Sequence, residues 1–507
     1  MKKIAILLIL IIPIAMILSA QQKSVDDLII SSFMKSIESV GDESKREDLY
    51  KSILKTQIMH NETELFEETA RKIDLEEREV VVSSICRQMI DMKRMNSALS
   101  IMHFTKRYEQ SIFLMEIGEY YFKTGKSDEY AKSLKCMTDL LKDETEQYYR
   151  SRIMSNAANM YILKKDNVNA IDYLTKALYA TFPMSNSAYK TYAIADVSSG
   201  YIKINDRIIS GILLMQLSGG SDFNKFVTLF EIYRQRNLID TAKRMLDRGY
   251  ASVLKEKDAE LKTERLIFLG EDYLKIGERK KATECYLEAV KNAKSIVSRG
   301  RRVDAMIKAN AFLGKKTEWD RIIEESSMIT DDESRNRAII SISRGMMKNG
   351  AKDKGFAILH IIEDNIRRGK NKPFVRKMIY DISEIYVDYG DKDKCSAYIG
   401  YLKRNFSEFP EIVSFMYMQN GKYTDALIYA NKVESGFTRG RTINEIILHA
   451  IMSGKKRDAE NILSENCRNI KKMKKGYERT LLSIELYNIG LENNFDMSEQ
   501  ISELAVL

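Results

Sequence analysis

The stretch from Leu269 to Ala289, LGEDYLKIGERKKATECYLEA, decides the fold of this chain. Leu269 and Tyr273 fall on one face of a helix, at the spacing of about one turn. Gly277 ends that helix, because glycine accepts the left-handed conformation that follows a helix C-terminus. After the charged residues ERKK, a second helix carries small and aromatic residues on one face: Ala282, Cys285, Tyr286 and Ala289. The stretch therefore predicts two helices joined by a tight turn, with small side chains where they approach closely.

The same pattern recurs along most of the chain. We call the place that Ala282 takes in its helix the packing position. Eleven residues are expected there, at intervals of 31 to 40 residues: Ala98, Tyr130, Ala170, Ile209, Ala242, Ala282, Trp319, Gly355, Cys395, Ala426 and Ala459. Trp319 replaces a small residue, and we interpret it as filling a wider gap between helices. So many copies in one phase indicate an array of helix pairs.

This spacing of small and aromatic residues resembles the tetratricopeptide repeat (TPR), a 34-residue helix-turn-helix unit, although its usual tryptophan and late proline are missing. The resemblance implies an all-α fold, a right-handed α-solenoid of about eleven TPR-like repeats. Each repeat buries its apolar face only against its neighbours, so we expect no separate domains within the array.

We expect the array to cover residues 79–470, with a possible hinge near 217–223 at LSGGSDF. Residues 21–78 are expected to form an N-terminal helical cap, because residues 25–75 look helical but out of register. Residues 471–507 are expected to form C-terminal capping helices.

The first twenty residues, MKKIAILLILIIPIAMILSA, have two lysines, an apolar run and a small final residue. That order is typical of a secretory signal peptide. The alternative is an uncleaved transmembrane anchor, since the apolar run is near the lower length limit for crossing a bilayer. Either reading predicts a protein outside the cytoplasm, periplasmic or secreted, with membrane contact only if the segment stays uncleaved.

Composition agrees with a folded helical protein. Of 507 residues, 44% are hydrophobic and 30% are charged, and only four are proline. The formal net charge is +9, but basic and acidic residues are interspersed without a long basic block. Because the protein is also expected outside the cytoplasm, we expect no nucleic-acid partner. The five cysteines lie about fifty or more residues apart, which is unlike a disulfide framework or a metal site, so we expect buried thiols.

No catalytic constellation is present in the sequence. There are four histidines, none in an HExxH motif, and there is no GxSxG or GxGxxG. We therefore expect no enzyme activity, no cofactor and no metal. A less favoured alternative is an enzyme built like the helical-toroid lyases, with a site of tyrosine and arginine between helices.

Four R-x-R pairs stand out, at 150/152, 299/301, 335/337 and 439/441. Each first arginine lies twenty residues before a packing position, so all four are expected to open the first helix of a repeat. Such placement is electrostatically unfavourable, because a helix N-terminus carries partial positive charge. One interpretation is that these arginines pair with acidic residues of the preceding repeat, such as Glu325, Asp331, Asp332, Glu333 or Glu434.

The other interpretation is partner binding. In TPR arrays the first helices line a concave groove that binds extended peptides, and arginine forks suit carboxylates. The candidate partner-binding residues are Arg152, Arg301, Arg337 and Arg441. We therefore expect a non-enzymatic interaction or scaffold protein of a bacterial cell envelope that binds a protein or peptide, acidic if the arginines are its ligands. The alternative is a self-associating structural protein of the envelope.

Overall fold

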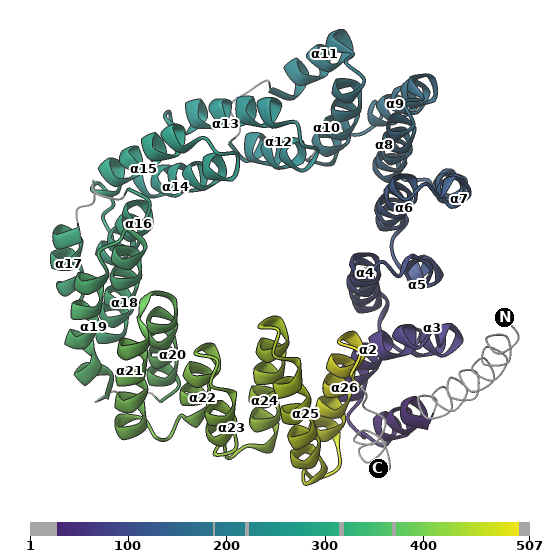
Figure 1. Ribbon diagram of the computed structural model, residues 1–507. Helices are drawn as coiled ribbons and strands as arrows, with labels where there is room; N and C mark the ends of the chain where they lie inside the picture. The colour runs from purple at the N-terminus through teal and green to yellow at the C-terminus, as the bar shows by residue number, and fades with distance from the viewer. Residues whose placement is uncertain (1–27, 186–187, 219–222, 314–318, 368–371, 496–507) are drawn as a thin grey trace, which may run out of the picture. The chain divides into compact units, whose positions relative to one another are not determined.

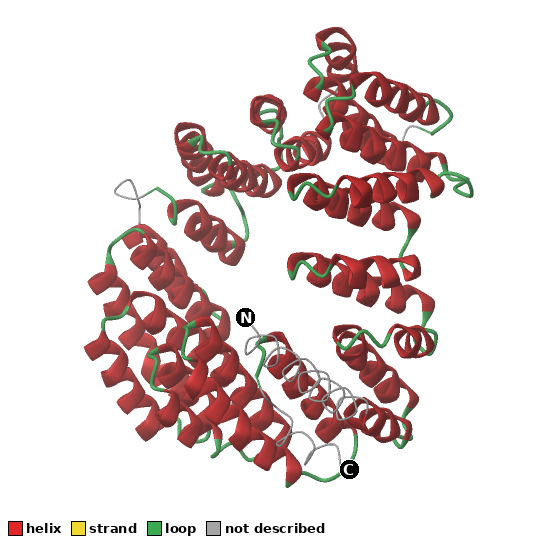
Figure 2. Cartoon of the chain, turned by 45° about the vertical axis from the view of Figure 1, so that its right-hand side comes forward, coloured by secondary structure: helices red, strands yellow, loops and turns green. Residues whose placement is uncertain are grey.

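The structure, a computed structural model, describes the chain except residues 1–27, 186–187, 219–222, 314–318, 368–371 and 496–507. The expected signal peptide, and the centre of the expected hinge at 219–222, lie outside the described residues. The described residues are helices and loops without a strand (Figure 2). The expected all-α repeat fold is therefore confirmed.

The helices follow one another in pairs, preceded by a helix over residues 28–38 and followed by α26 (Tyr477–Glu492). The pairs are α2/α3 (Glu43–Met59, Thr63–Ala70), α4/α5 (Leu75–Asp91, Met95–Ile101, then the short η1, Met102–Phe104), α6/α7 (Arg107–Lys123, Ser127–Asp139), α8/α9 (Gln147–Leu163, Asn167–Thr181), α10/α11 (Ala188–Lys203, Arg207–Ser218), α12/α13 (Phe223–Gln235, Ile239–Val253), α14/α15 (Ala259–Lys275, Arg279–Ala293), α16/α17 (Arg299–Asn310, Trp319–Ser327), α18/α19 (Asp332–Lys348, Lys352–Arg367), α20/α21 (Lys372–Tyr389, Lys392–Asn405), α22/α23 (Pro410–Gln419, Tyr423–Ala430) and α24/α25 (Gly436–Met452, Lys456–Lys471).

The pair α14/α15 shows why the sequence folds this way. The face of α14 with Leu269 and Tyr273 is fully buried against α15. Gly270 allows the close approach, because a Cβ there would lie 2.7 Å from the ring of Tyr286. Gly277 has φ +80°, and its N–H donates to the carbonyl of Leu274 over 3.0 Å, which closes the helix end. The predicted turn and packing are confirmed here.

The backbone fixes the register of the pairs. In most of them, one residue with positive φ lies five residues before the packing position, as Gly277 precedes Ala282. By this measure two predictions were wrong. Asn205 (φ 61°) places the buried Ser210, not Ile209, at the packing position of α11. Asn61 (φ 62°) places the fully buried Phe66 in register, although residues 25–75 were expected to be out of register.

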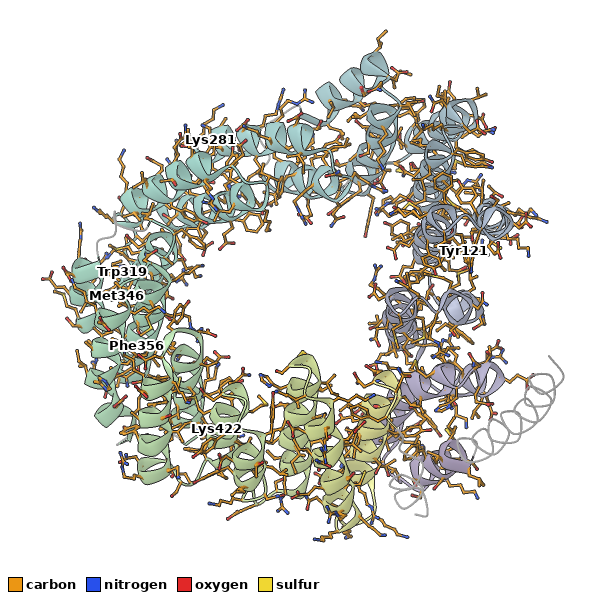
Figure 3. All side chains as sticks on the ribbon, viewed as in Figure 1. Tyr121, Lys281, Trp319, Met346, Phe356 and Lys422 are labelled. Carbon is orange, nitrogen blue, oxygen red and sulfur yellow. The ribbon has the colours of Figure 1, made fainter. Side chains whose placement is uncertain are left out.

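The pair α16/α17 also differs from the prediction. The fully buried Ile322 takes the packing position of α17, because it is the fourth residue of its helix, as Ala282 is in α15. Trp319 lies one turn earlier on the same face and is 6% exposed (Figure 3). Its indole packs over Gly345 of α18, where a Cβ would come within 2.5 Å of the ring. Trp319 thus fills a space between helices, as the sequence analysis interpreted it.

The chain divides into two compact units, whereas the sequence analysis expected no separate domains. Unit 1 combines the residues up to Thr105 with those from Tyr386 onward, and unit 2 is Lys106–Ile385. The chain passes from one unit to the other just before α6 and again near the end of α20. The residue bounds of array and caps, and the right-handed sense of the solenoid, stay predictions.

In unit 2 the first helices of the pairs lie along one side, and the second helices lie along the other (Figure 1). Successive first helices contact one another directly, as α6, α8 and α10 do. We call the face formed by α6, α8, α10, α12, α14, α16 and α18 the first-helix surface. It is the place where the sequence analysis expected a partner to bind.

Candidate binding surface on the first helices

Three of the four R-x-R pairs share one register in the structure. Arg150, Arg335 and Arg439 are each the fourth residue of a first helix. Arg299, by contrast, is the first residue of α16, so the expected common phase of all four pairs was wrong. The cause is the shift in α17 described above, which makes Arg302 the equivalent of the other three. Asp304 then takes the place that Arg152, Arg337 and Arg441 hold in their helices.

The fourth-position arginines bind backbone carbonyls, and two of them also pair with carboxylates that the sequence analysis named: Arg302 with Glu325 over 3.0 Å, and Arg335 with Asp332. Each guanidinium donates to the carbonyl oxygen six residues earlier, in the loop after the preceding second helix. These bonds are Arg150–Glu144 (2.6 Å), Arg302–Ile296 (2.7 Å), Arg335–Ile329 (3.1 Å) and Arg439–Val433 (2.9 Å). Carbonyls near a helix C-terminus carry partial negative charge, which offsets the unfavourable position of an arginine at a helix N-terminus.

Sequence reasoning missed this role because it treated each R-x-R as one motif. Two lone arginines could have shown it. Arg46 of α2 donates to the carbonyl of Val40 over 3.2 Å, and Arg479 of α26 donates to that of Met473 over 3.0 Å. Both repeat the six-residue separation without a second arginine two positions later.

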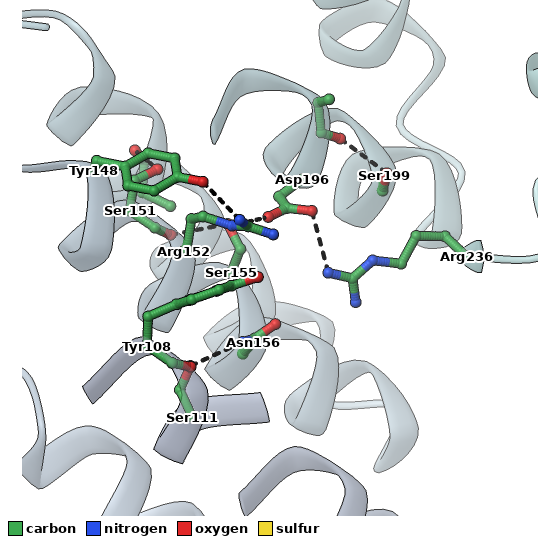
Figure 4. Close-up of polar contacts among 12 residues, drawn as sticks. Tyr108, Ser111, Tyr148, Ser151, Arg152, Ser155, Asn156, Asp196, Ser199 and Arg236 are labelled. Atoms are coloured by element: carbon green, nitrogen blue, oxygen red, sulfur yellow. Dashed lines mark hydrogen bonds and ion pairs between the residues drawn. The ribbon is translucent and has the colours of Figure 1, made fainter. Parts of the chain in front are cut away.

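Arg152 lies within a polar cluster between first helices (Figure 4). Its Nε donates to Asp196 of α10 over 2.7 Å, and its Nη1 donates to the hydroxyl of Tyr148 over 2.7 Å. The guanidinium also lies 4.1 Å from the ring centroid of Tyr108 on α6. Arg236 donates to the other oxygen of Asp196 over 3.1 Å. The cluster therefore links α6, α8 and α10 with the residue that follows α12.

Burial and charge in this cluster indicate a structural role. The side chains of Arg152 and Asp196 are only 15% and 4% exposed. Burial acts to lower the pKa of Arg152, but the charge of Asp196 and the neighbouring phenols outweigh it and leave the pKa raised. For the neighbouring Tyr108, burial raises the pKa of the phenol. Arg152 therefore stays charged and engaged with Asp196.

Arg301 and Arg441 are more exposed, and each forms an ion pair with a residue of another helix. Arg301 Nη1 lies 2.8 and 3.0 Å from the two carboxylate oxygens of Glu260 on α14. The hydrogen bond and charge of Glu260 raise the pKa of Arg301. Arg441, in unit 1, lies 3.1 Å from Glu485 on α26. Neither partner is among the carboxylates that the sequence analysis named.

Arg337 differs from these three arginines. Within the described part of the chain it has no carboxylate within 4.0 Å, and its guanidinium lies 5.5 Å from the ring centroid of Phe374 on α20. The structure thus does not bring the four predicted residues together into one site. Three of them join neighbouring helices, and their role in partner binding stays a prediction.

A groove opens between α14 and α16, on the first-helix surface of unit 2. Its volume is about 640 Å³, within the range of about 300–1,000 Å³ that is usual for binding pockets. The residues that line it are Glu260, Glu264, Ile267, Phe268, Glu271, Ile296, Arg301, Asp304, Ala305 and Lys308. Sequence reasoning named only Arg301 among these. The signal it missed is the spacing of Glu260, Glu264 and Glu271, which places three carboxylates on one face of α14.

The groove combines an apolar wall with an acidic rim. Ile267, Ile296 and Ala305 form buried parts of the wall, whereas the ring of Phe268 is 42% exposed. Four carboxylates and two basic side chains give the lining a formal net charge of −2. Among the lining residues, all of which the structure describes, Glu260 and Arg301 form the one ion pair across it. The structure therefore offers an acidic groove where the arginines had suggested a basic one.

Among the described residues, no group of three or more His, Cys, Asp or Glu side chains is arranged to hold a metal ion. Within the same residues, none of the helices combines the length and the apolar character that crossing a bilayer requires.

Comparisons with known proteins give only distant structural likenesses. No protein-family model matches the chain, and no curated protein matches it in sequence. Three similar solved structures are Ton1535 from Thermococcus onnurineus NA1 (10% identity, 81% of this chain and 99% of that one, TM-score 0.25), a putative kinesin light chain of Podosopora anserina with TPR-like repeats (14%, 44% and 96%, 0.20), and NprR in complex with its cognate peptide NprX (10%, 71% and 98%, 0.20). With TM-scores this low, the fold rests on the helix pairs described above.

Proposed function

We propose that this protein is a non-enzymatic interaction scaffold that holds a segment of a partner protein on the first-helix surface of unit 2. The observation that carries the proposal is the groove between α14 and α16. It is large enough for several side chains of a ligand, and it exposes the ring of Phe268 beside charged residues. Apolar surface with a few convergent charged groups is the usual composition of a binding pocket.

The repeat architecture supports a scaffold. Each pair of helices packs on its neighbours. Polar side chains between first helices therefore connect one repeat to the next, as Arg152 of α8 and Asp196 of α10 do. The solvent-facing side of the first helices is then available for a partner. We place this function outside the cytoplasm, and the support for that location is the sequence pattern of the first twenty residues.

Crosslinking in the native host tests the proposal. The tagged full-length chain would be crosslinked in cells and purified, and the captured proteins identified by mass spectrometry. The comparison is with a Phe268→Ala variant, which removes the exposed ring at the groove, and with Glu288→Gln on α15 as a control outside the groove lining. We expect the wild type and the control to capture one shared partner and Phe268→Ala to lose it. Unchanged capture by a folded Phe268→Ala variant would contradict the proposal.

A further inference from the structure

We propose that the groove between α14 and α16 binds a cationic segment, one in which a lysine or arginine lies next to an apolar side chain. This inference rests on the proposed function and names the chemistry of its partner. It reverses the expectation of an acidic partner, which came from the R-x-R pairs.

The register of the two helices places carboxylates opposite one another. The Arg301–Glu260 ion pair aligns the start of α16 with the start of α14. Glu264 lies four residues after Glu260, and Asp304 lies three residues after Arg301, so both are about one turn further along. Both side chains are exposed and line the groove. Its middle therefore has a carboxylate on either wall.

The groove lining also holds two basic residues: Arg301, whose pKa the charge of Glu264 helps to raise, and Lys308, four residues after Asp304. Within the described residues, neither Glu264 nor Asp304 has a lysine, arginine or histidine nitrogen within 4.0 Å. A cationic side chain between them would form charge-assisted hydrogen bonds without displacing an existing pair. An acidic ligand at the same place would meet like charges, which opposes binding.

The next turn of α14 indicates that the ligand also carries an apolar side chain. Phe268 lies four residues after Glu264, so its exposed ring is adjacent to the central carboxylates on the same helix face. Ile267 and Ala305 continue the apolar wall behind it. A ligand that pairs with Glu264 and Asp304 can thus bury a leucine- or phenylalanine-like side chain against Phe268 within about one residue's reach.

Synthetic peptides test this inference directly. Three peptides of about ten residues, alike except for lysine, glutamine or glutamate beside a central leucine, would be titrated into the full-length protein by fluorescence anisotropy. We expect the lysine peptide to bind at least about tenfold more tightly than the glutamine peptide, and the glutamate peptide to bind most weakly. Raising the salt concentration should narrow these differences, because the charged groups are exposed.

Variants of the chain connect the effect to this groove. The double variant Glu264→Gln with Asp304→Asn should weaken binding of the lysine peptide by about tenfold or more and leave the affinity for the glutamine peptide unchanged. The control variant Glu288→Gln should change neither affinity. The inference is overturned if the glutamate peptide binds as tightly as the lysine peptide, or if the double variant keeps the preference for lysine. If that double variant still captures the native partner, the proposed scaffold function stands, and only the cationic character of the bound segment is rejected.

Discussion

At the scale of single residues, close approach of helices depends on glycine. Gly270 faces the ring of Tyr286, and both lie in the core of the α14/α15 pair. We predict that Gly270→Ala lowers the free energy of unfolding by about 1–3 kcal/mol, because the added methyl overpacks this contact. Gly211→Ala on α11 is the control, since a Cβ there meets nothing within 4 Å. It should stabilise by up to about 1 kcal/mol, because alanine favours helix. Urea denaturation measures both, and equal effects would contradict the prediction.

Asp272 of α14 is a buried carboxylate whose effect on the stability of the folded protein depends on pH. It is 1% exposed, its Oδ1 accepts a hydrogen bond from Lys275 over 2.7 Å, and its Oδ2 has no partner. Burial raises the pKa of Asp272. The folded state therefore binds this proton more tightly than the unfolded state, and stability falls as pH rises through the folded pKa.

We accordingly predict that Asp272→Asn stabilises the protein at neutral pH, by about 1 kcal/mol, because it removes a buried charge. The gain should shrink towards about pH 4, where the carboxyl group of the wild type is increasingly protonated. Urea midpoints at both pH values measure the difference. A gain that is the same at both pH values would show that the charge of Asp272 is not its cause.

At the scale of helices, the two arginines of one R-x-R pair have different roles. Arg439 donates from Nε and Nη2 to the carbonyls of Val433 and Glu434, whereas Arg441 forms an exposed ion pair with Glu485. We predict that Arg439→Ala costs about 1–3 kcal/mol of stability and Arg441→Ala less than about 1 kcal/mol, since surface ion pairs contribute little. Thermal denaturation of the two variants side by side provides the measurement. The reverse order would contradict the backbone role assigned to Arg439.

The first and last parts of the chain meet within unit 1, where α26 packs on α2. The hydroxyl of Thr56 donates to Asn488 over 2.7 Å, and the hydroxyl of Tyr487 lies 2.9 Å from Nε2 of His60. Helices that were expected to cap opposite ends of the array thus cover one another.

We predict that Asn488→Ala weakens both helices together, by about 1–2 kcal/mol, because it removes the partner of a buried hydroxyl. Hydrogen exchange should become faster in α2 as well as in α26, although they are far apart in sequence. Asn493→Ala is the control, since the Asn493 side chain donates only to Ile489, four residues earlier in the same helix. Faster exchange confined to α26 would show that the two helices are not coupled.

At the scale of the whole molecule, the five cysteines all lie within the described residues and form no disulfide, but the expectation that all of them are buried was wrong for Cys136. Cys136 is exposed, whereas Cys86, Cys285, Cys395 and Cys467 are buried. Burial raises the pKa of Cys285 to about 12, which leaves little reactive thiolate at neutral pH. We predict that one thiol reacts rapidly with a disulfide reagent in the native protein and that all five react after denaturation. A second rapid thiol, or fewer than five in denaturant, would contradict this placement.

The sequence by itself determined the helix pairs and most of their register, because small residues and turn glycines act locally. Gly277 predicts its turn and Ala282 predicts its helix packing from local sequence alone, without knowledge of how distant repeats are arranged. The sequence predicts the burial of Phe66 and Ser210 only ambiguously, because neither has the small apolar side chain that is typical of the packing position.

The tertiary structure alone decided what the charged residues do. Whether Arg301 meets a ligand or Glu260 depends on a helix 41 residues away in sequence, and no periodicity encodes that distance. The acidic groove has the same origin, because Glu264 and Asp304 line one groove only once α14 and α16 lie side by side. Local patterns therefore predicted the repeats, whereas the candidate site arises from charges that separate repeats bring together.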